Sequence, residues 1–238
     1  MQIVWSLGAL VRALPAQGMQ TLEALLDRIH ALFDSDRQKR QQVAFSVAMI
    51  ALSAKMAKAD GVVSQAEIAA FQQIFSIPPD EMRNVFRLYD LARQDVAGYE
   101  AYAAKMAALC DDDGQSCELL ADVLDGLFHI AKADGMVHPR ELDFLRQIAG
   151  IFGLADEQFA AIRYRHVAVG KDGPYAVLGL DPGEGAERVR ARYLELVKEN
   201  HPDRLAARGV PDEFMAIGIE RMKAINAAYA SVAKGAAL

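Results

Sequence analysis

A histidine, a proline and an aspartate stand in succession near the C-terminus, at His201, Pro202 and Asp203. Pro202 fixes its own backbone and biases His201 away from the helical region, so a helix that arrives here must stop. Asp203 is then left on a stiff turn, where its carboxylate can accept a bidentate hydrogen bond from an arginine of another protein. The three residues therefore predict a recognition corner for a partner protein.

Positively charged residues surround this corner. They would mainly speed and orient the encounter with an acidic partner surface. An equally weighted interpretation is a solvated helix face with internal ion pairs, such as Arg192 with Glu195. The cations are Arg188, Arg190, Arg192, Lys198 and Arg204.

Helical patterns flank the corner on both sides. A helix is expected over residues 186–200 and a second one downstream, each with apolar residues on one face. A short helix opening at Tyr175 should brace the two, which would lie antiparallel and joined by the loop that holds the corner. The apolar positions are Val189, Tyr193, Leu196 and Val197 upstream, and Phe214, Ile217, Met222, Ile225, Tyr229 and Val232 downstream.

This unit resembles a J domain, the signature unit of DnaJ-type co-chaperones, over residues 174–234. The resemblance implies a partner in the ATPase half of a DnaK-class (Hsp70) chaperone, and a binding site formed by His201, Pro202, Asp203 and Arg204 with the cations of the preceding helix. Many J domains carry basic residues where this chain has Leu194 and Glu195. The matching residues are Tyr175-x-x-Leu178-Gly179, Tyr193, His201-Pro202-Asp203-Arg204 and Ile225-Asn226-x-Ala228-Tyr229.

An internal repeat marks the first part of the chain. Residues 57–63 recur as residues 131–137, and Glu67 matches Glu141. Gly61 and Gly135 can each end a helix, so we expect two helix–loop–helix copies related by a pseudo-two-fold axis. The repeat resembles the TerB-like family over roughly residues 37–168, which implies a helical interaction or metal-sensing module. A TerB-like domain before a C-terminal J domain is the order found in the DnaJ-like protein A branch, and the segment 205–211 is similar to the loop of that branch.

The repeat also raises the question of metal binding. Its Asp-Gly-x-Val-x-x-x-x-Glu pattern echoes the second half of a calcium loop, but methionine, isoleucine and lysine occupy the first and third ligand positions. Asp60, Glu67, Asp134 and Glu141 are therefore weak metal candidates. A looser acidic site stays open beside the interpretation of a solvated acidic face with helix caps. Its members would be Glu118, Asp122, Asp125, Asp134 and Glu141.

The pattern as a whole predicts an all-α protein, because no segment shows sustained period-two alternation. We divide it into N-terminal amphipathic helices at 1–36, a TerB-like helical domain at 37–168 and a J domain at 174–238, with a short linker at 169–174. Residues 1–173 carry all of the net charge of −6, and residues 174–238 carry none. Helices of the middle domain are expected over 37–58, 79–93, 96–109, 116–133, 139–152 and 156–167.

Composition and residue spacing argue against several classes of protein. The net charge of −6 argues against a general nucleic-acid binder. Cys110 and Cys117 are too few for a disulfide scaffold and wrongly spaced for zinc, which favours a reduced, cytoplasmic chain. The histidines form no metalloenzyme pair, and there is neither a phosphate loop nor a nucleophile elbow, so we expect no enzyme and no cofactor. The helix Ile3–Leu14 either docks on the bundle or lies on the cytoplasmic face of the inner membrane.

The leading hypothesis is a J-domain co-chaperone that stimulates the ATPase of a DnaK-class chaperone, with the TerB-like domain choosing a client or location that the sequence does not identify. The alternative is a metal- or stress-responsive interaction module whose J domain is secondary. The full flanking context of His201-Pro202-Asp203 favours the first.

Overall fold

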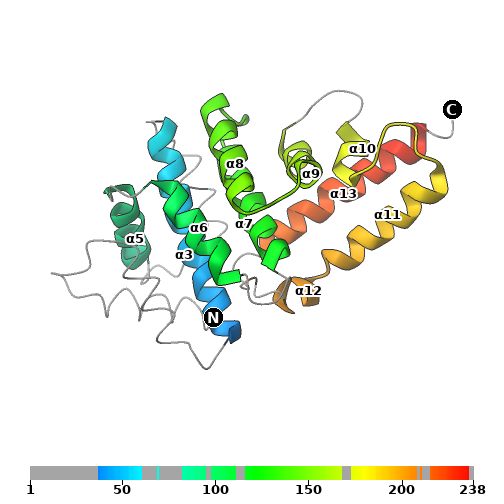
Figure 1. The fold of residues 1–238 in the computed structure, drawn as a ribbon. Coiled ribbons are helices and arrows are strands. Elements are labelled where there is room, and N and C mark those ends of the chain that lie inside the picture. The colour runs from blue at the N-terminus through cyan, green and yellow to red at the C-terminus, as the bar shows by residue number, and fades with distance from the viewer. Residues whose placement is uncertain are drawn as a thin grey trace.

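The structure is a computed structural model that describes residues 37–60, 69, 82–94, 98–110, 116–167, 173–207, 210 and 215–235. Within these ranges every regular element is a helix, which confirms the all-α prediction (Figure 1). The helices are α3 Arg37–Asp60, α5 Met82–Gln94, α6 Tyr99–Cys110, α7 Ser116–Ala131, α8 Pro139–Ile151, α9 Asp156–His166, α10 Gly173–Leu178, α11 Ala186–Glu199, α12 Pro202–Ala207 and α13 Met215–Gly235.

Helix α3 is the central element of the N-terminal bundle, which we define as α3 to α9. It packs against α5, α6, α7 and α8. Every side chain from Phe45 to Ala57 is buried, as the nearly uninterrupted apolar sequence of this segment predicts. The polar groups inside it have partners: Ser53 donates to the Met49 carbonyl at 2.5 Å, and Lys55 lies over the ring of Tyr102.

The second copy of the repeat forms α7, a turn and α8. Gly135 has a φ of +109°, a conformation that favours glycine. His138 is the N-cap of α8, because its Nδ1 accepts the Arg140 N–H at 3.2 Å while Glu141 accepts the His138 N–H at 2.8 Å. Residues 61–68 and 70–81, which hold most of the first copy's loop and second helix, lie outside the described residues, so the two-fold relation stays a prediction.

Helices α10 to α13 form the C-terminal hairpin. Tyr193 of α11 stacks on Tyr229 of α13 with ring centroids 4.1 Å apart, and its hydroxyl donates to Asn226 at 3.0 Å. Asn200, at the other end of α11, contacts Arg221. Since residues later in α11 meet residues earlier in α13, the two helices run antiparallel, as predicted (Figure 1).

The two halves share a hydrophobic core. Leu205, Val210 and Ile217 of the hairpin belong to the same buried cluster as the bundle side chains. Gly126 of α7 makes room for this contact, because a Cβ at that position would lie 2.8 Å from Ile217 Cδ1. Gly173, expected in the linker, instead begins α10, and residues 168–172 lie outside the described residues.

Ile217→Ala should therefore destabilise the whole chain, not the hairpin alone. Its side chain is 5% exposed in the shared core. We expect the free energy of unfolding to fall by about 2–4 kcal/mol, from lost burial and the cavity left behind. Urea denaturation followed by circular dichroism measures it. Ile219→Ala, two residues on and 56% exposed, is the matched control and should change stability by no more than about 0.5 kcal/mol. Equal effects of the two variants would contradict the shared core.

Candidate functional site

The His-Pro-Asp corner, defined as residues 201–203, lies where α11 ends and α12 begins. Asn200 closes α11, since its backbone N–H and its Nδ2 both donate to the Leu196 carbonyl, at 3.0 and 2.7 Å. Pro202 is the first residue of α12, a position where the missing N–H costs nothing. His201 Nδ1 accepts the Asp203 N–H at 3.2 Å and so caps the new helix. The corner is thus a tight junction of two helices.

Helix α12 corrects the prediction of a simple connecting loop. Residues 202–207 form a short helix because Pro202 and the His201 cap start it and Leu205, only 3% exposed, anchors it in the shared core. The predicted stop of α11 at Asn200 is confirmed. Sequence patterns missed α12 because six residues are too few to show a helical period.

The corner is open to solvent. The side chain of His201 is 59% exposed and that of Asp203 is 91% exposed. The carboxylate of Asp203 lies 3.5 Å from His201 Nδ1. The bundle therefore leaves the Asp203 carboxylate accessible to solvent, and the helix junction holds in place the backbone that carries it.

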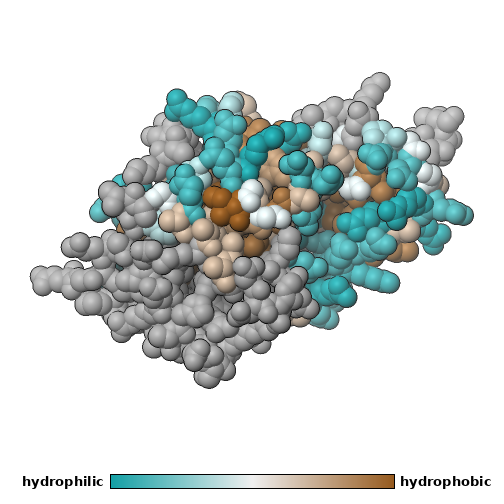
Figure 2. Space-filling model, viewed as in Figure 1, coloured by the Kyte–Doolittle hydropathy of each residue, from teal (hydrophilic) through white to brown (hydrophobic). Residues whose placement is uncertain are grey.

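Four of the five predicted cations are exposed, namely Arg188 and Arg190 in the first part of α11, Lys198 near its end and Arg204 in α12. Arg192 differs, because its Nη1 donates to Glu195 at 3.1 Å and to Glu199 at 3.3 Å. The internal pair considered for this residue is therefore present. Leu194 is 48% exposed and shares a helix row with Arg190 and Lys198, four residues away on each side. In Figure 2, mainly hydrophilic residues cover the region where Figure 1 places α11.

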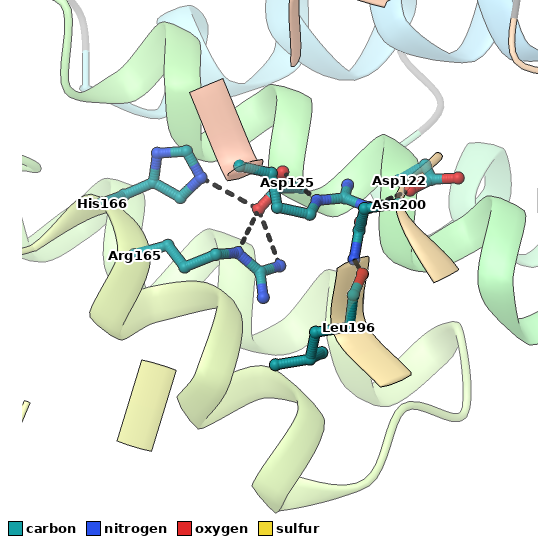
Figure 3. Close-up of polar contacts among 7 residues, drawn as sticks. Asp122, Asp125, Arg165, His166, Leu196 and Asn200 are labelled. Carbon is teal, nitrogen blue, oxygen red and sulfur yellow. Dashed lines mark hydrogen bonds and ion pairs between the residues drawn. The ribbon is translucent and has the colours of Figure 1, made fainter. Parts of the chain in front are cut away.

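A buried ion network lies behind the corner, and sequence reasoning did not anticipate it. We use this name for Asp122, Asp125, Arg165, His166, Asn200 and Arg221. Arg221 of α13 donates to Asp125 Oδ2 at 2.9 Å, to Asp122 Oδ1 at 2.6 Å and to Asn200 Oδ1 at 2.9 Å. Figure 3 shows the carboxylates of α7 beside Asn200 at the end of α11. The looser acidic site predicted around Asp122 and Asp125 is thus an arginine-binding site within the chain.

Asp125 is the centre of this network. Its Oδ1 accepts from Arg165 Nε at 3.1 Å, from Arg165 Nη2 at 2.9 Å and from His166 at 3.0 Å (Figure 3). Burial alone would raise the pKa of Asp125, but the charges of Arg165 and Arg221 and the bond to His166 hold it well below its ordinary value. Asp125 is therefore a carboxylate whose charge is balanced by cations from two other helices.

His166 joins this network as a neutral imidazole. Burial lowers the pKa of His166 to about 4, although the neighbouring carboxylate acts in the opposite direction. Its Nε2 then carries the proton that Asp125 accepts. Its Nδ1 is buried and makes no hydrogen bond with the described residues, and its ring stacks on Phe128 at 5.6 Å.

A sequence signal for the network exists, although it is weak. Arg221 lies four residues from both Ile217 and Ile225, so it falls on the apolar face of its helix. Asp122 and Asp125 likewise fall among the buried positions of α7. Charged residues on an apolar face indicate buried ion pairs, but they do not say which partners meet.

The metal candidates take other roles where they are described. Glu141 closes the cap of α8, and Asp134 accepts the Met136 N–H at 3.3 Å. The side chains of Asp60 and Glu67 lie outside the described residues. Within the part of the chain that the structure describes, no group of three or more His, Cys, Asp or Glu side chains could hold a metal ion.

The fold and the corner define an all-helical protein in which a TerB-like bundle carries a helical hairpin with a His-Pro-Asp corner. Residues 46–164, half of the chain, match the family described as "Tellurite resistance protein TerB", and the chain belongs to this family.

The chain is also similar to proteins named "Co-chaperone protein DjlA". It is 27% identical to the one from Photobacterium profundum over 82% of this chain and 79% of the relative. The one from Vibrio cholerae is 29% identical over 83% of this chain and 80% of the relative, and that from Legionella pneumophila is 23% identical over 84% and 79%. These findings confirm the resemblance to the DnaJ-like protein A branch. No solved structure gives a significant match. Across the described ranges, no helix has both the length and the apolar character needed to cross a membrane.

His166 should make the stability of the chain depend on pH. Unfolding exposes the imidazole, whose ordinary pKa of 6.5 exceeds its folded pKa of about 4. The unfolded chain then binds a proton that the folded chain does not, so stability falls as the pH falls from 6.5 to 4, by roughly 3 kcal/mol in all.

Urea denaturation at pH 7.5, 5.5 and 4.5 measures this slope. His166→Phe keeps the stacking on Phe128 but cannot titrate, and should reduce the slope. Burial also lowers the pKa of His129, which supplies part of the slope that remains. His201→Gln, which removes a histidine at an exposed position, is the matched control for the loss of an imidazole. An unchanged slope in His166→Phe would show that this histidine does not titrate between the two states.

Proposed function

We propose that this protein is a co-chaperone that stimulates ATP hydrolysis by a DnaK-class (Hsp70) chaperone through the His-Pro-Asp corner. The observation that carries the proposal is the exposed Asp203 carboxylate on a helix junction, between antiparallel helices in the order of a J domain. The similarity to relatives named as co-chaperones supports the broader role. The role is regulatory, because the ATP chemistry belongs to the partner.

The chemistry of the corner suits the recognition of a partner arginine. Asp203 presents both carboxylate oxygens to solvent, and a guanidinium can bind such a group with two parallel hydrogen bonds. The His201 cap holds the backbone N–H of Asp203, so the position from which the carboxylate projects is fixed before binding.

The exposed cations would act before contact. Arg188, Arg190, Lys198 and Arg204 attract an acidic partner surface and orient it toward the corner. Such steering weakens as salt rises. Arg192 contributes less to it, since Glu195 and Glu199 hold its guanidinium.

The remaining assignments complete the proposal. We assign the chaperone contact to the J domain at 174–238, and targeting or interaction with a client to the TerB-like domain at 37–168. The low cysteine content supports a cytoplasmic location. The protein would be either free there or held on the cytoplasmic face of the inner membrane through residues 1–36.

Asp203→Asn and His201→Gln should each abolish stimulation of the partner ATPase. The first replaces the charged acceptor, and the second alters the cap that places it. A steady-state ATPase assay with the DnaK-class chaperone of the same organism measures the effect. We expect a loss of at least about tenfold, which corresponds to a loss of about 1.4 kcal/mol of binding or activation.

Asp181→Asn is the matched control, because Asp181 is an exposed aspartate of the same hairpin that lies in the turn before α11. It should stimulate like the wild type. The proposal fails if the wild-type chain gives no stimulation, or if Asp203→Asn and Asp181→Asn stimulate equally.

A further inference from the structure

The exposed corner is bounded by buried residues on both sides. Residues 201–204 are all exposed, whereas Asn200 is 6% exposed and Leu205 is 3% exposed. The chain thus leaves the protein interior at one position and returns to it five residues later. What holds these two boundary residues determines where the corner points.

Arg221 holds the first boundary. Asn200 uses both ends of its amide: Nδ2 donates to the Leu196 carbonyl at 2.7 Å, and Oδ1 accepts from Arg221 at 2.9 Å. The amide is therefore fixed between its own helix and α13. Because the backbone of Asn200 leads directly into His201, a displacement of this amide would also displace the corner.

The bundle in turn holds Arg221. Its guanidinium contacts Asp122 at 2.6 Å and Asp125 at 2.9 Å, two carboxylates of α7 that are three residues apart. Arg165 and His166 of α9 hold Asp125 from the other side. All of these groups are buried or nearly so, and moving Arg221 away would take a cation from two buried carboxylates, so the arrangement has little freedom.

The bundle also holds the second boundary. Leu205 packs in the shared core, against a face of α13 where Gly218 makes room for it. A Cβ on Gly218 would meet Leu205 Cδ1, so these two helices touch closely. The corner is thus fixed before His201 by a polar contact and after Arg204 by an apolar one.

We propose that Arg221 is a positioning residue for the His-Pro-Asp corner, and that Asp122 and Asp125 make the TerB-like bundle a structural part of the chaperone-stimulating site. This inference rests on the proposed function. The hairpin is accordingly not a freely tethered J domain. A chaperone bound at the corner would sit at a fixed orientation relative to any protein bound by the bundle.

The test uses the full chain and the partner ATPase, with stimulation measured over a range of co-chaperone concentrations. The main variant is Arg221→Met with Asp122→Asn. It breaks the link to Asn200 and removes, together with the arginine, one of the two carboxylates that the arginine contacts, a choice made to retain the fold. Arg221→Lys keeps the positive charge but loses the planar guanidinium that donates to Asp122, Asp125 and Asn200 together. Arg140→Met is the matched control, because Arg140 is an exposed arginine of the bundle away from the corner.

A misplaced corner lowers the maximal stimulated rate, because the exposed cations still bring the partner to the site. We expect the double variant to lower this plateau by roughly tenfold while the half-saturating concentration changes little. Arg221→Lys should restore part of the plateau, and Arg140→Met should match the wild type. A variant that is merely partly unfolded would instead raise the half-saturating concentration and leave the plateau unchanged. That result would overturn the inference.

Hydrogen–deuterium exchange separates this inference from the proposed function. In the double variant, amides of residues 200–207 should exchange faster than in the wild type, and those of α8 should not. If the wild type fails to stimulate any chaperone but this exchange difference appears, the function is wrong and the positioning is right. If exchange at 200–207 is unchanged, the positioning is wrong whatever the ATPase shows.

Discussion

The fold depends on two buried aspartates, whose charges are balanced only by residues from other helices. Asp122 and Asp125 lie on the inner face of α7, and each is less than a twentieth exposed. A carboxylate at such a depth is tolerated only when cations and hydrogen bonds replace its water. Arg221 from α13 and Arg165 from α9 supply the cations, so α7, α9 and α13 must meet at one point. This meeting fixes the hairpin on the bundle, and the shared core around Ile217 follows the same geometry.

A His-Pro pair starts a helix at two places in the chain, with different consequences. His138-Pro139 and His201-Pro202 each start a helix, and in both the histidine Nδ1 accepts a backbone N–H at 3.2 Å. At α8 the third residue after the histidine is Glu141, whose carboxylate closes the cap. At α12 that position holds Arg204, and the acidic residue stands one position earlier, as Asp203, facing solvent. The first pair therefore only starts a helix, whereas the second leaves a charged group available for recognition.

Local patterns predicted most helices to within a few residues, because the helical period and the proline and glycine signals act over short stretches of chain. The stop at Asn200 follows directly from Pro202. The short helix α12 escaped prediction, since it depends on the burial of Leu205 against α13. Arg192 was predicted equally as a docking cation or as an internal partner of Glu195. The structure shows the internal pair with Glu195 and adds a second contact with Glu199.

The sequence alone determined an all-α chain, its repeat and the position of the His-Pro-Asp corner, because each of these depends on residues close together in the chain. Only the tertiary structure decided what stands behind the corner. Asp122 and Arg221 are 99 positions apart, and their contact depends on how the two halves dock. A charged residue on an apolar face indicates that a buried ion pair must form. It does not identify the partner, because the packing of the surrounding apolar faces determines which residues meet. The orientation of the corner is set by that long-range choice.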